Sequence, residues 1–354
     1  WGRGWYVWNN DKDTAYLRSD EPTTVSVLSN DVSPVGRILA VQSVSVPADV
    51  QAKGVVVELL ESTLVRVTSP QTLTSQIGFT YTISDGVRTS TAGVTIVPVP
   101  PLTKHQPPIA RDDEVTVRAG DIVTVDVLDN DEHPDDSRMF LADDLVTEPS
   151  AGLAFVNADR VRFQAPDEPG QYTAAYRVLD AYGESAAATV TFTVTPVDEE
   201  SNREPRPEPV VARVLSGGSI RIELPLQRID PDGDSVQLLG TPTNPTMGSI
   251  EEMGADYLVY TAFPGMSGTD AFSYQVYDAF GKTGTADIRI AVIAPPESMQ
   301  NPSAVPDSVS VRPGKIAQVD LTANDSDPQS SRISVDEKLI EVPEGIEAEG
   351  DVFE

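Results

Sequence analysis

The stretch Phe79-Thr-Tyr-Thr-Ile-Ser-Asp-Gly86 decides the fold of this chain, because the chain repeats it twice more. It returns as Ala174-Ala-Tyr-Arg-Val-Leu-Asp180 and again as Phe272-Ser-Tyr-Gln-Val-Tyr-Asp278. Successive copies lie roughly 100 residues apart, whereas solenoid and propeller repeats have periods of up to roughly 50 residues. Each copy therefore belongs to a separate small domain.

A second shared segment precedes this stretch and marks the start of each unit. The windows Asp13–Asp31, Asp113–Asp131 and Asp307–Asp325 align without a gap, and each ends in Asn-Asp. The last unit stops at Glu354, before its own copy of the Tyr-containing stretch. We therefore expect a Trp-rich segment, three complete domains and one partial domain, at residues 1–10, 11–100, 106–197, 205–295 and 302–354.

Apolar and polar residues alternate along most of each unit. In the second unit Val115 and Val117 alternate with polar residues, as do Val123 and Val125 beyond a Gly120-Asp121 turn. A period of two is typical of half-buried strands, and no comparable stretch has helical apolar spacing. Short strands with frequent turns predict an all-β fold of tandem immunoglobulin-like antiparallel β-sandwich domains arranged end to end.

Each repeated stretch ends in a turn signal that predicts a β-hairpin. Asp85-Gly86, Asp180-Ala-Tyr-Gly183 and Asp278-Ala-Phe-Gly281 all contain a glycine, which supplies the positive φ that such a turn requires. The tyrosine of each stretch occupies the position of the tyrosine corner in such sandwiches, so we interpret it as a fold determinant. These residues are Tyr81, Tyr176 and Tyr274.

Proline-rich segments separate the units. They run over residues 98–108, 196–209 and 295–302. Linkers of this composition extend and stiffen a chain, which predicts a monomeric, elongated rod.

Composition excludes several classes of protein. The chain has no cysteine, so it holds no disulfide, zinc–thiolate site or thiol nucleophile. Its 25 basic and 55 acidic residues give a net charge of −30, which repels nucleic acid. This acidity either keeps an exposed rod soluble or recruits divalent cations. No apolar run is long enough to span a membrane.

The chain begins with Trp1-Gly-Arg-Gly-Trp5-Tyr-Val-Trp8, which is neither a start methionine nor a signal peptide. This segment is either a strand that packs on the first domain or an exposed aromatic platform for a ligand. We expect the chain to be a piece of a longer polypeptide, so that any secretion signal or anchor lies outside it.

The residues resemble those of a known family. The third unit carries Gly268-Thr-Asp-Ala-Phe272-Ser-Tyr-Gln-Val-Tyr-Asp278 and then a valine-rich last strand. This order, after Asn-Asp, resembles the bacterial Ig-like and cadherin-like tandem repeats of secreted or surface-attached adhesins. The first unit lacks the Gly-Thr-Asp, and the third has Ile229-Asp230 in place of Asn-Asp. The resemblance implies a spacer or adhesive stalk outside the cell.

The sharpest candidate site is Asp230-Pro-Asp232-Gly-Asp234. Three carboxylates at alternate positions around a turn aim several oxygens at one point, as Ca²⁺ prefers. The pattern is not an EF-hand, because Ser235 stands where the sixth-position glycine should be. The chain resembles adhesins whose joints between domains are stiffened by calcium, and this favours calcium ligands here. Aspartates are also ordinary turn residues, so calcium ligands and solvated turns both remain open.

Acidic residues of the other units offer equivalent candidates. We expect the loops around the Asn-Asp pairs to correspond to this segment, with Asp31 as the acidic residue of the first unit. Asp112-Asp113 and Asp307, beside the linkers, are further candidates for an ion between domains. The equivalent metal ligands in the second and fourth units are Asp129, Asp131, Asp135 and Asp136, and Asp325 and Asp327.

Nothing in the sequence predicts an active site. His105 lies in a linker and His133 in an acidic loop, and neither has a repeated serine or aspartate placed for a catalytic triad. No Gly-x-Ser-x-Gly, zinc-binding histidine pair or phosphate-binding glycine loop occurs. We therefore expect a region that is not an enzyme.

Two hypotheses about function follow. The first is an extracellular or cell-surface spacer or adhesion region, which contacts proteins or glycans and is rigidified by calcium where calcium binds. The second is an accessory region of a secreted enzyme that binds glycan or protein through exposed aromatic residues. Tyr182 and Phe280 at the hairpin tips are the aromatic residues that could serve it. The scarcity of other aromatics favours the spacer.

Overall fold

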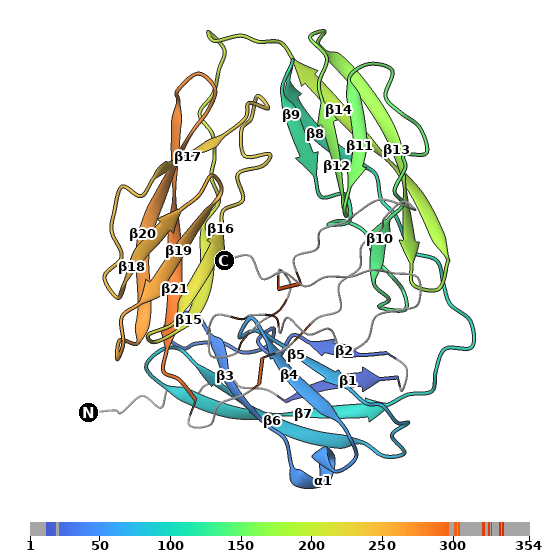
Figure 1. Cartoon of the computed structure of the whole chain (residues 1–354), viewed down its shortest axis with the longest axis vertical. Coiled ribbons are helices and arrows are strands. Elements are labelled where there is room, and N and C mark those ends of the chain that lie inside the picture. The colour runs from blue at the N-terminus through green and yellow to red at the C-terminus, as the bar shows by residue number, and fades with distance from the viewer. Residues whose placement is uncertain are drawn as a thin grey trace.

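The computed structural model describes residues 12–18, 21–296, 301–302, 304, 321–322, 325, 327, 333 and 335. Within them the chain forms three β-sandwiches of two sheets each (Figure 1). This confirms the predicted fold class of tandem immunoglobulin-like sandwiches. The Trp-rich segment and nearly all of the partial fourth unit lie outside the described residues.

One sheet of each sandwich has four strands and contains the repeated Tyr stretch. In the first repeat the order is β1 (Asp13–Leu17), β7 (Thr89–Pro98), β6 (Ile77–Ser84) and β3 (Ala40–Ser45). In the second it is β8 (Asp113–Arg118), β14 (Ser185–Thr195), β13 (Gly170–Asp180) and β10 (Met139–Leu141). In the third it is β15 (Val210–Leu215), β21 (Thr283–Ile293), β20 (Gly268–Tyr277) and β17 (Gln237–Gly240).

The opposite sheet of each sandwich has three strands. In the first repeat they are β2 (Thr23–Val25), β5 (Leu64–Thr68) and β4 (Val56–Leu60). In the second they are β9 (Ile122–Val125), β12 (Arg160–Gln164) and β11 (Leu153–Asn157). In the third they are β16 (Ser219–Glu223), β19 (Tyr257–Ala262) and β18 (Gly248–Met253). A helix of four residues, α1 (Ala48–Gln51), precedes β4.

The first strand of each repeat runs parallel to the last strand, whereas the Tyr strand and the last strand form the predicted antiparallel hairpin. First and last strands therefore end at the same end of the sandwich, which we call the tail face. The hairpin turn lies at the opposite end, which we call the head face. The turn glycines Gly86, Gly183 and Gly281 have φ of 84°, 89° and 85°, as predicted.

The period-two pattern builds the core of each sandwich. In β13 the alternate residues Ala174, Tyr176 and Val178 are fully buried, and they pack in one cluster with Val161 and Phe163 of the facing sheet. Burying a side chain of valine or phenylalanine size stabilises the fold by roughly 1.5–3 kcal/mol. The other two repeats have equivalent clusters of their own, so each repeat has a separate core.

The tyrosine of each repeated stretch belongs to the fold, as predicted. The Tyr176 hydroxyl donates to Asp113 Oδ2 at 2.7 Å, and Asn130 Nδ2 donates to Asp113 Oδ1 at 3.1 Å. In the first repeat Tyr81 and Asn30 bond Asp13 in the same way, at 2.8 and 3.0 Å. The repeated Asn-Asp motif therefore serves a buried corner.

The arrangement of the repeats differs from the expected row. The third repeat follows the second but also lies against the first, so that the three repeats form a triangle (Figure 1). The hydrophobic effect stabilises this arrangement, because apolar side chains of the first and third repeats bury one another in a cluster separate from the three cores. The cluster comprises Ile38, Ala40, Leu215, Ala291 and Ile293.

Within the described residues no helix is long and apolar enough to cross a membrane.

Candidate functional site

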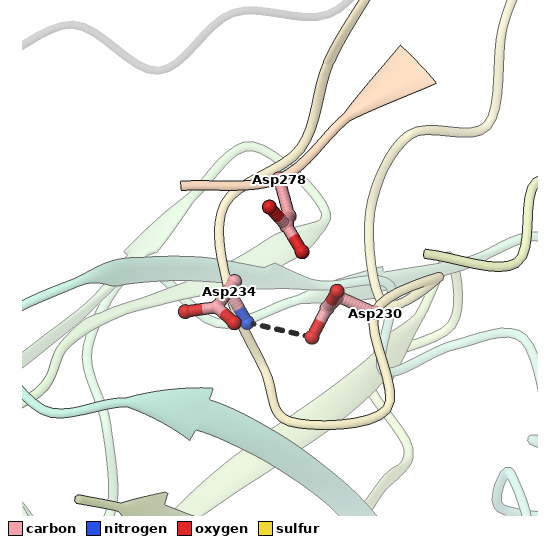
Figure 2. Close-up of side chains that lie close together, drawn as sticks. All are labelled: Asp230, Asp234 and Asp278. Atoms are coloured by element: carbon pink, nitrogen blue, oxygen red, sulfur yellow. Dashed lines mark hydrogen bonds between the residues drawn. The ribbon is translucent and has the colours of Figure 1, made fainter. Parts of the chain in front are cut away.

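Three aspartates of the third repeat meet at its head face, beside the second repeat. Asp230 and Asp234 lie in the loop between β16 and β17, and Asp278 follows β20. Each offers a carboxylate oxygen, and these oxygens lie within 4.8 Å of one another (Figure 2). Among the described residues this is the one cluster of potential metal-ligating side chains. All three residues are buried.

Asp230 leaves one of its oxygens without a partner. Its Oδ1 accepts hydrogen bonds from the backbone nitrogens of Asp232 and Asp234, at 2.8 and 3.2 Å. Its Oδ2 is buried and has no hydrogen-bond partner, and Figure 2 shows this second oxygen on the side toward Asp278. Burial raises the pKa of the Asp230 carboxyl group, because it disfavours the charged form.

Asp234 is paired with an arginine of the second repeat. Arg118 Nε and Nη2 donate to its two oxygens at 2.7 and 2.5 Å, in the bidentate geometry that suits a guanidinium group. Arg118 also donates to the carbonyl oxygen of Pro196 at 2.7 Å and to Asn202 Oδ1 at 3.2 Å. The guanidinium lies 5.5 Å from the centre of the Phe280 ring.

Asp278 completes the cluster from the hairpin turn. Its Oδ1 accepts from the backbone nitrogens of Phe280 and Lys282, at 2.9 and 2.8 Å. Its Oδ2 accepts from Asn202 Nδ2 at 2.7 Å. Asn202 thus connects Asp278 to Arg118 across the junction between the second and third repeats.

Asp232, predicted as a third ligand of the loop, is not part of this cluster. Its carboxylate forms an ion pair with Arg203, whose Nη2 lies 2.6 Å from Asp232 Oδ1. The hydrogen bond from Arg203 holds the pKa of Asp232 below its usual range. The structure therefore brings together Asp230 and Asp234 but turns Asp232 outward to the linker.

The equivalent loops are not the ones that the Asn-Asp motif indicates. The loop begins with a residue whose side chain accepts the backbone N–H four residues later: Ser33 from Arg37 at 3.3 Å, and His133 from Ser137 at 3.3 Å. In the same way, Asp230 accepts the backbone N–H of Asp234 at 3.2 Å. The fourth position has positive φ in each loop, at Gly36, Asp136 and Gly233.

His133 therefore corresponds to Asp230, and the expected match of Asp131 with Asp230 was wrong. The two Asn-Asp residues correspond instead to Gln227 and Arg228, because Val125 and Ile222 occupy equivalent positions in the facing sheet. The third repeat has neither the Asn-Asp pair nor the corner aspartate, whose position is taken by Val210.

The head faces of the first two repeats have no carboxylate at the positions of Asp230 and Asp234, whereas Asp85 and Asp180 correspond to Asp278. In the second repeat His133 Nε2 lies 3.2 Å from Asp180 Oδ2, while Nδ1 accepts two backbone N–H bonds. With Nδ1 accepting these two bonds, Nε2 is the ring nitrogen that faces the Asp180 carboxylate. In the first repeat Arg37 lies 3.7 Å from Asp85. Neither arrangement resembles a metal site.

The other predicted ligands of the second repeat have separate roles. Asp129 is exposed and lies 3.7 Å from Arg228. Asp131 accepts the backbone N–H of Arg111 at 2.7 Å, and burial raises its pKa. Asp135 accepts the backbone N–H of Gln106 in the preceding linker at 2.7 Å. These three carboxylates do not gather into a metal-binding group.

Asp325 and Asp327 of the fourth unit line a cavity of about 580 Å³ at the first and third repeats. Arg213 and Arg221 of the third repeat line the same cavity, so it carries both signs of charge. Asp307, the remaining candidate of that unit, lies outside the described residues.

Sequence reasoning missed the residues that connect the junction. Arg118 and Asn202 stand in the preceding repeat and the linker, so no motif within one repeat contains them. Asp278 was predicted only as a turn residue. It does lie in the turn, but its side chain also faces the Asp230 loop. The recurrence of this aspartate as Asp85 and Asp180 was the available signal.

Comparisons with solved structures give remote likenesses. An endo-fucoidan hydrolase of glycoside hydrolase family 107 is 15% identical over 80% of this chain and 43% of its own, with a TM-score of 0.25. The insect immune protein hemolin is 13% identical over 81% and 77%, with a TM-score of 0.31. Four N-terminal Ig domains of Dscam1 isoform 1.9 are 12% identical over 84% and 77%, also at 0.31. Likenesses this low transfer no activity.

The family of the chain follows from its sequence. No curated protein matches the chain. The model of the bacterial Ig domain matches it three times, over residues 7–97, 105–193 and 202–291, which agrees with the three sandwiches. These matches together cover well over half of the chain, so the chain belongs to the bacterial Ig domain family.

Proposed function

We propose that this region is a non-catalytic, extracellular spacer or adhesion region of a surface-attached or secreted protein. The observation that carries the proposal is the use of its buried polar residues. Many of them serve the tyrosine corners, as Asp113 does, or the junction between repeats, as Arg118 and Asn202 do. Such residues fix the fold and the arrangement of repeats, which is what a spacer requires.

The two histidines, which are the usual general bases, support the same proposal. His133 is buried and held by Asp180 and by two backbone N–H groups, with no serine hydroxyl bonded to it. The His105 ring stacks on Tyr182, with ring centres 3.5 Å apart. Neither ring has the neighbours of a catalytic base.

The alternative, an accessory ligand-binding region of a secreted enzyme, has less support. It depends on exposed aromatic residues, and Tyr182 and Phe280 were its candidates. Tyr182 stacks on His105 of the linker and bonds Glu21 of the first repeat, while Phe280 lies under Arg118. Both hairpin tips therefore contact the neighbouring repeat, although Tyr182 remains 42% exposed.

Exchange of the region within its parent protein separates the two functions. The region is replaced by three unrelated Ig-like domains of similar size, and adhesion or activity of the parent is measured. A spacer is replaceable, so we expect most of the parent's function to persist. Loss of binding to one defined glycan or protein, with expression and surface display unchanged, contradicts the spacer and supports the accessory binding region.

We propose, in addition, that calcium binds at the Asp230–Asp234–Asp278 cluster and at no other predicted loop within residues 12–296. Two oxygen ligands on opposite sides of a Ca²⁺ ion lie roughly 4.8 Å apart, since each bond is about 2.4 Å long. The carboxylate oxygens of the cluster fit within this distance. The free, buried Asp230 Oδ2 supplies a ligand that nothing else uses.

Calorimetric titration of the chelator-treated chain with CaCl₂ tests this site. We expect a single site that the substitution Asp278→Asn weakens at least tenfold, because it removes one charged ligand. Asp129→Asn is the matched control, since Asp129 is exposed and is not a member of the cluster. Equal calcium binding by the wild type and Asp278→Asn contradicts the proposed site, whereas the spacer function is unaffected by that outcome.

A further inference from the structure

The contact between the second and third repeats joins a tail face to a head face. The backbone N–H of Arg118, at the end of β8, donates to the carbonyl oxygen of Gly233 at 2.9 Å. Thr195, at the end of β14, donates through its hydroxyl to the carbonyl oxygen of Asp232 at 2.6 Å. A Cβ atom on Gly233 would lie 2.6 Å from Val117 Cα, so the two backbones are in close contact.

The contact between the third and first repeats joins the same two kinds of face. Leu215 ends β15 where Arg118 ends β8, and Ile293 ends β21 where Thr195 ends β14. Both side chains are 3% exposed or less, and they pack with Ile38 and Ala40 just after the head-face loop of the first repeat. The chain thus uses one type of contact twice, the second time between repeats that no linker joins.

Polar and backbone contacts fix the orientation of this second contact. Arg213 Nε donates to the carbonyl oxygen of Leu39 at 2.6 Å, and Gln42 Nε2 donates to that of Ala294 at 2.7 Å. A Cβ atom on Gly86, in the hairpin turn of the first repeat, would lie 2.6 Å from Gly268 Cα. The backbones are therefore as close as at Gly233, and the surfaces match in shape as well as in apolar character.

We propose that the head face of the first repeat is a docking site for the tail face of the third repeat, and that a second copy of this chain can supply the tail. The two faces are complementary and different, so the contact is heterologous. Within one chain it closes the triangle, because the attached third repeat has a high effective concentration. When closure within a chain is blocked, the same faces join two copies head to tail.

The first measurement is the distance between spin labels on the first and third repeats. Because the chain has no cysteine, Val56→Cys and Leu239→Cys give two unique labels on exposed strand positions. We expect one narrow distance distribution for the otherwise unchanged chain. The additional substitution Leu215→Glu, which places a charge in the apolar contact, should broaden it. A narrow distribution that survives Leu215→Glu overturns the docking site.

The second measurement mixes two disabled chains and follows their sedimentation. Leu215→Glu leaves the head face intact, and Ala40→Glu leaves the tail face intact, so neither chain can close. We expect each alone to be monomeric and the mixture to form a one-to-one complex. Half-assembly should fall between roughly 10 µM and 1 mM, because a contact held closed within one chain at an effective concentration in the millimolar range need not be strong.

A control and a fold check complete the test. Met253→Glu places the same charge on an exposed strand position of the third repeat, and it should neither broaden the distance distribution nor allow assembly with Ala40→Glu. Far-ultraviolet circular dichroism confirms that each variant is folded, as the separate cores predict. No complex in the mixture of the two disabled chains at 1 mM overturns assembly between copies.

Discussion

Asp230→Asn should stabilise the third repeat when no divalent cation is present. The substitution keeps Oδ1, which accepts the backbone N–H groups of Asp232 and Asp234, and it removes a buried charge. It also replaces the unpartnered Oδ2 with an amide that can donate to Asp278. In a metal-free protein, the native aspartate is the less favourable residue at this position.

The size of the effect follows from the geometry of the cluster. Two charges 4.8 Å apart at an effective dielectric constant of 20 repel by about 3.5 kcal/mol. Asp230 has two such neighbours, and the Arg118 guanidinium on Asp234 offsets one of them. The hydrogen bond that the new amide can donate to the buried Asp278 carboxylate stabilises the variant by a further amount of about 1–3 kcal/mol. Because solvent and protein relaxation screen part of this repulsion, we expect a net gain of about 1–3 kcal/mol at pH 7.

The gain should depend on pH in a defined direction. Burial raises the pKa of Asp230 above 3.8, so the folded state binds the Asp230 proton more tightly than the unfolded state does. The wild type therefore loses stability as pH rises from 3.8 through the folded pKa, whereas the asparagine variant does not. The advantage of the variant should be small below pH 3.8 and reach its full value above the folded pKa.

Differential scanning calorimetry in chelator, from pH 3 to pH 7, measures this gain. A change of 1 kcal/mol moves the melting temperature of a domain of this size by about 4–8 °C. Excess calcium should reverse the order, because a ligand at one hundred times its Kd stabilises the wild type by about 2.7 kcal/mol. A variant that melts below the wild type in chelator at pH 7 refutes the reasoning.

Four further substitutions test other parts of the structure. Arg118→Met leaves Asp234 buried without its partner, so calorimetry should show a loss of about 3–5 kcal/mol at the junction and a larger response to calcium. Tyr176→Phe removes a bond to a buried carboxylate and should cost about 1–3 kcal/mol in urea unfolding, whereas Tyr274→Phe, which loses one bond to a carbonyl, should cost about 0.5–1.5 kcal/mol. Gly233 has φ of 83° and leaves no room for a Cβ atom. Gly233→Ala should therefore move the second and third repeats apart without unfolding either, which small-angle scattering can detect.

The fold could be predicted from the sequence because its signals are local and repeated. The alternation in Thr189-Val-Thr-Phe-Thr-Val194 reports which side chains face the core, and the structure buries Val190, Phe192 and Val194. The hairpin turns follow from their glycines. Both kinds of signal lie within a few residues of the structure that they determine.

The candidate site was predicted only in part, because its members are far apart in the sequence. Asp230 and Asp234 share a loop and were found, but Asp278, Asn202 and Arg118 meet them from other elements. The Asn-Asp motif misled the search in the other repeats. In the first two repeats its asparagine bonds the aspartate that accepts from the corner tyrosine, so the motif belongs to the fold there.

The triangle could not be predicted for a related reason. Proline-rich linkers describe how neighbours are connected, but they do not report which distant surfaces are complementary. Leu215 reads as one more apolar residue at the end of a strand. Its role becomes clear only by comparison with Arg118, which occupies the same position in the second repeat. Arg118 is cationic and meets the carboxylates of the third repeat, whereas Leu215 is apolar and meets Ile38 and Ala40 of the first.

This pairing of faces means that the order of the repeats is itself encoded in the side chains. The third repeat carries the carboxylates of Asp230, Asp234 and Asp278 at its head, and its charge balance depends on a cation supplied from outside it. The second repeat supplies that cation as Arg118, whereas a copy of the third repeat placed before it would supply Leu215 and leave Asp234 buried and unpaired. Sandwiches of one fold are therefore not interchangeable along this chain, and the junctions, more than the cores, distinguish them.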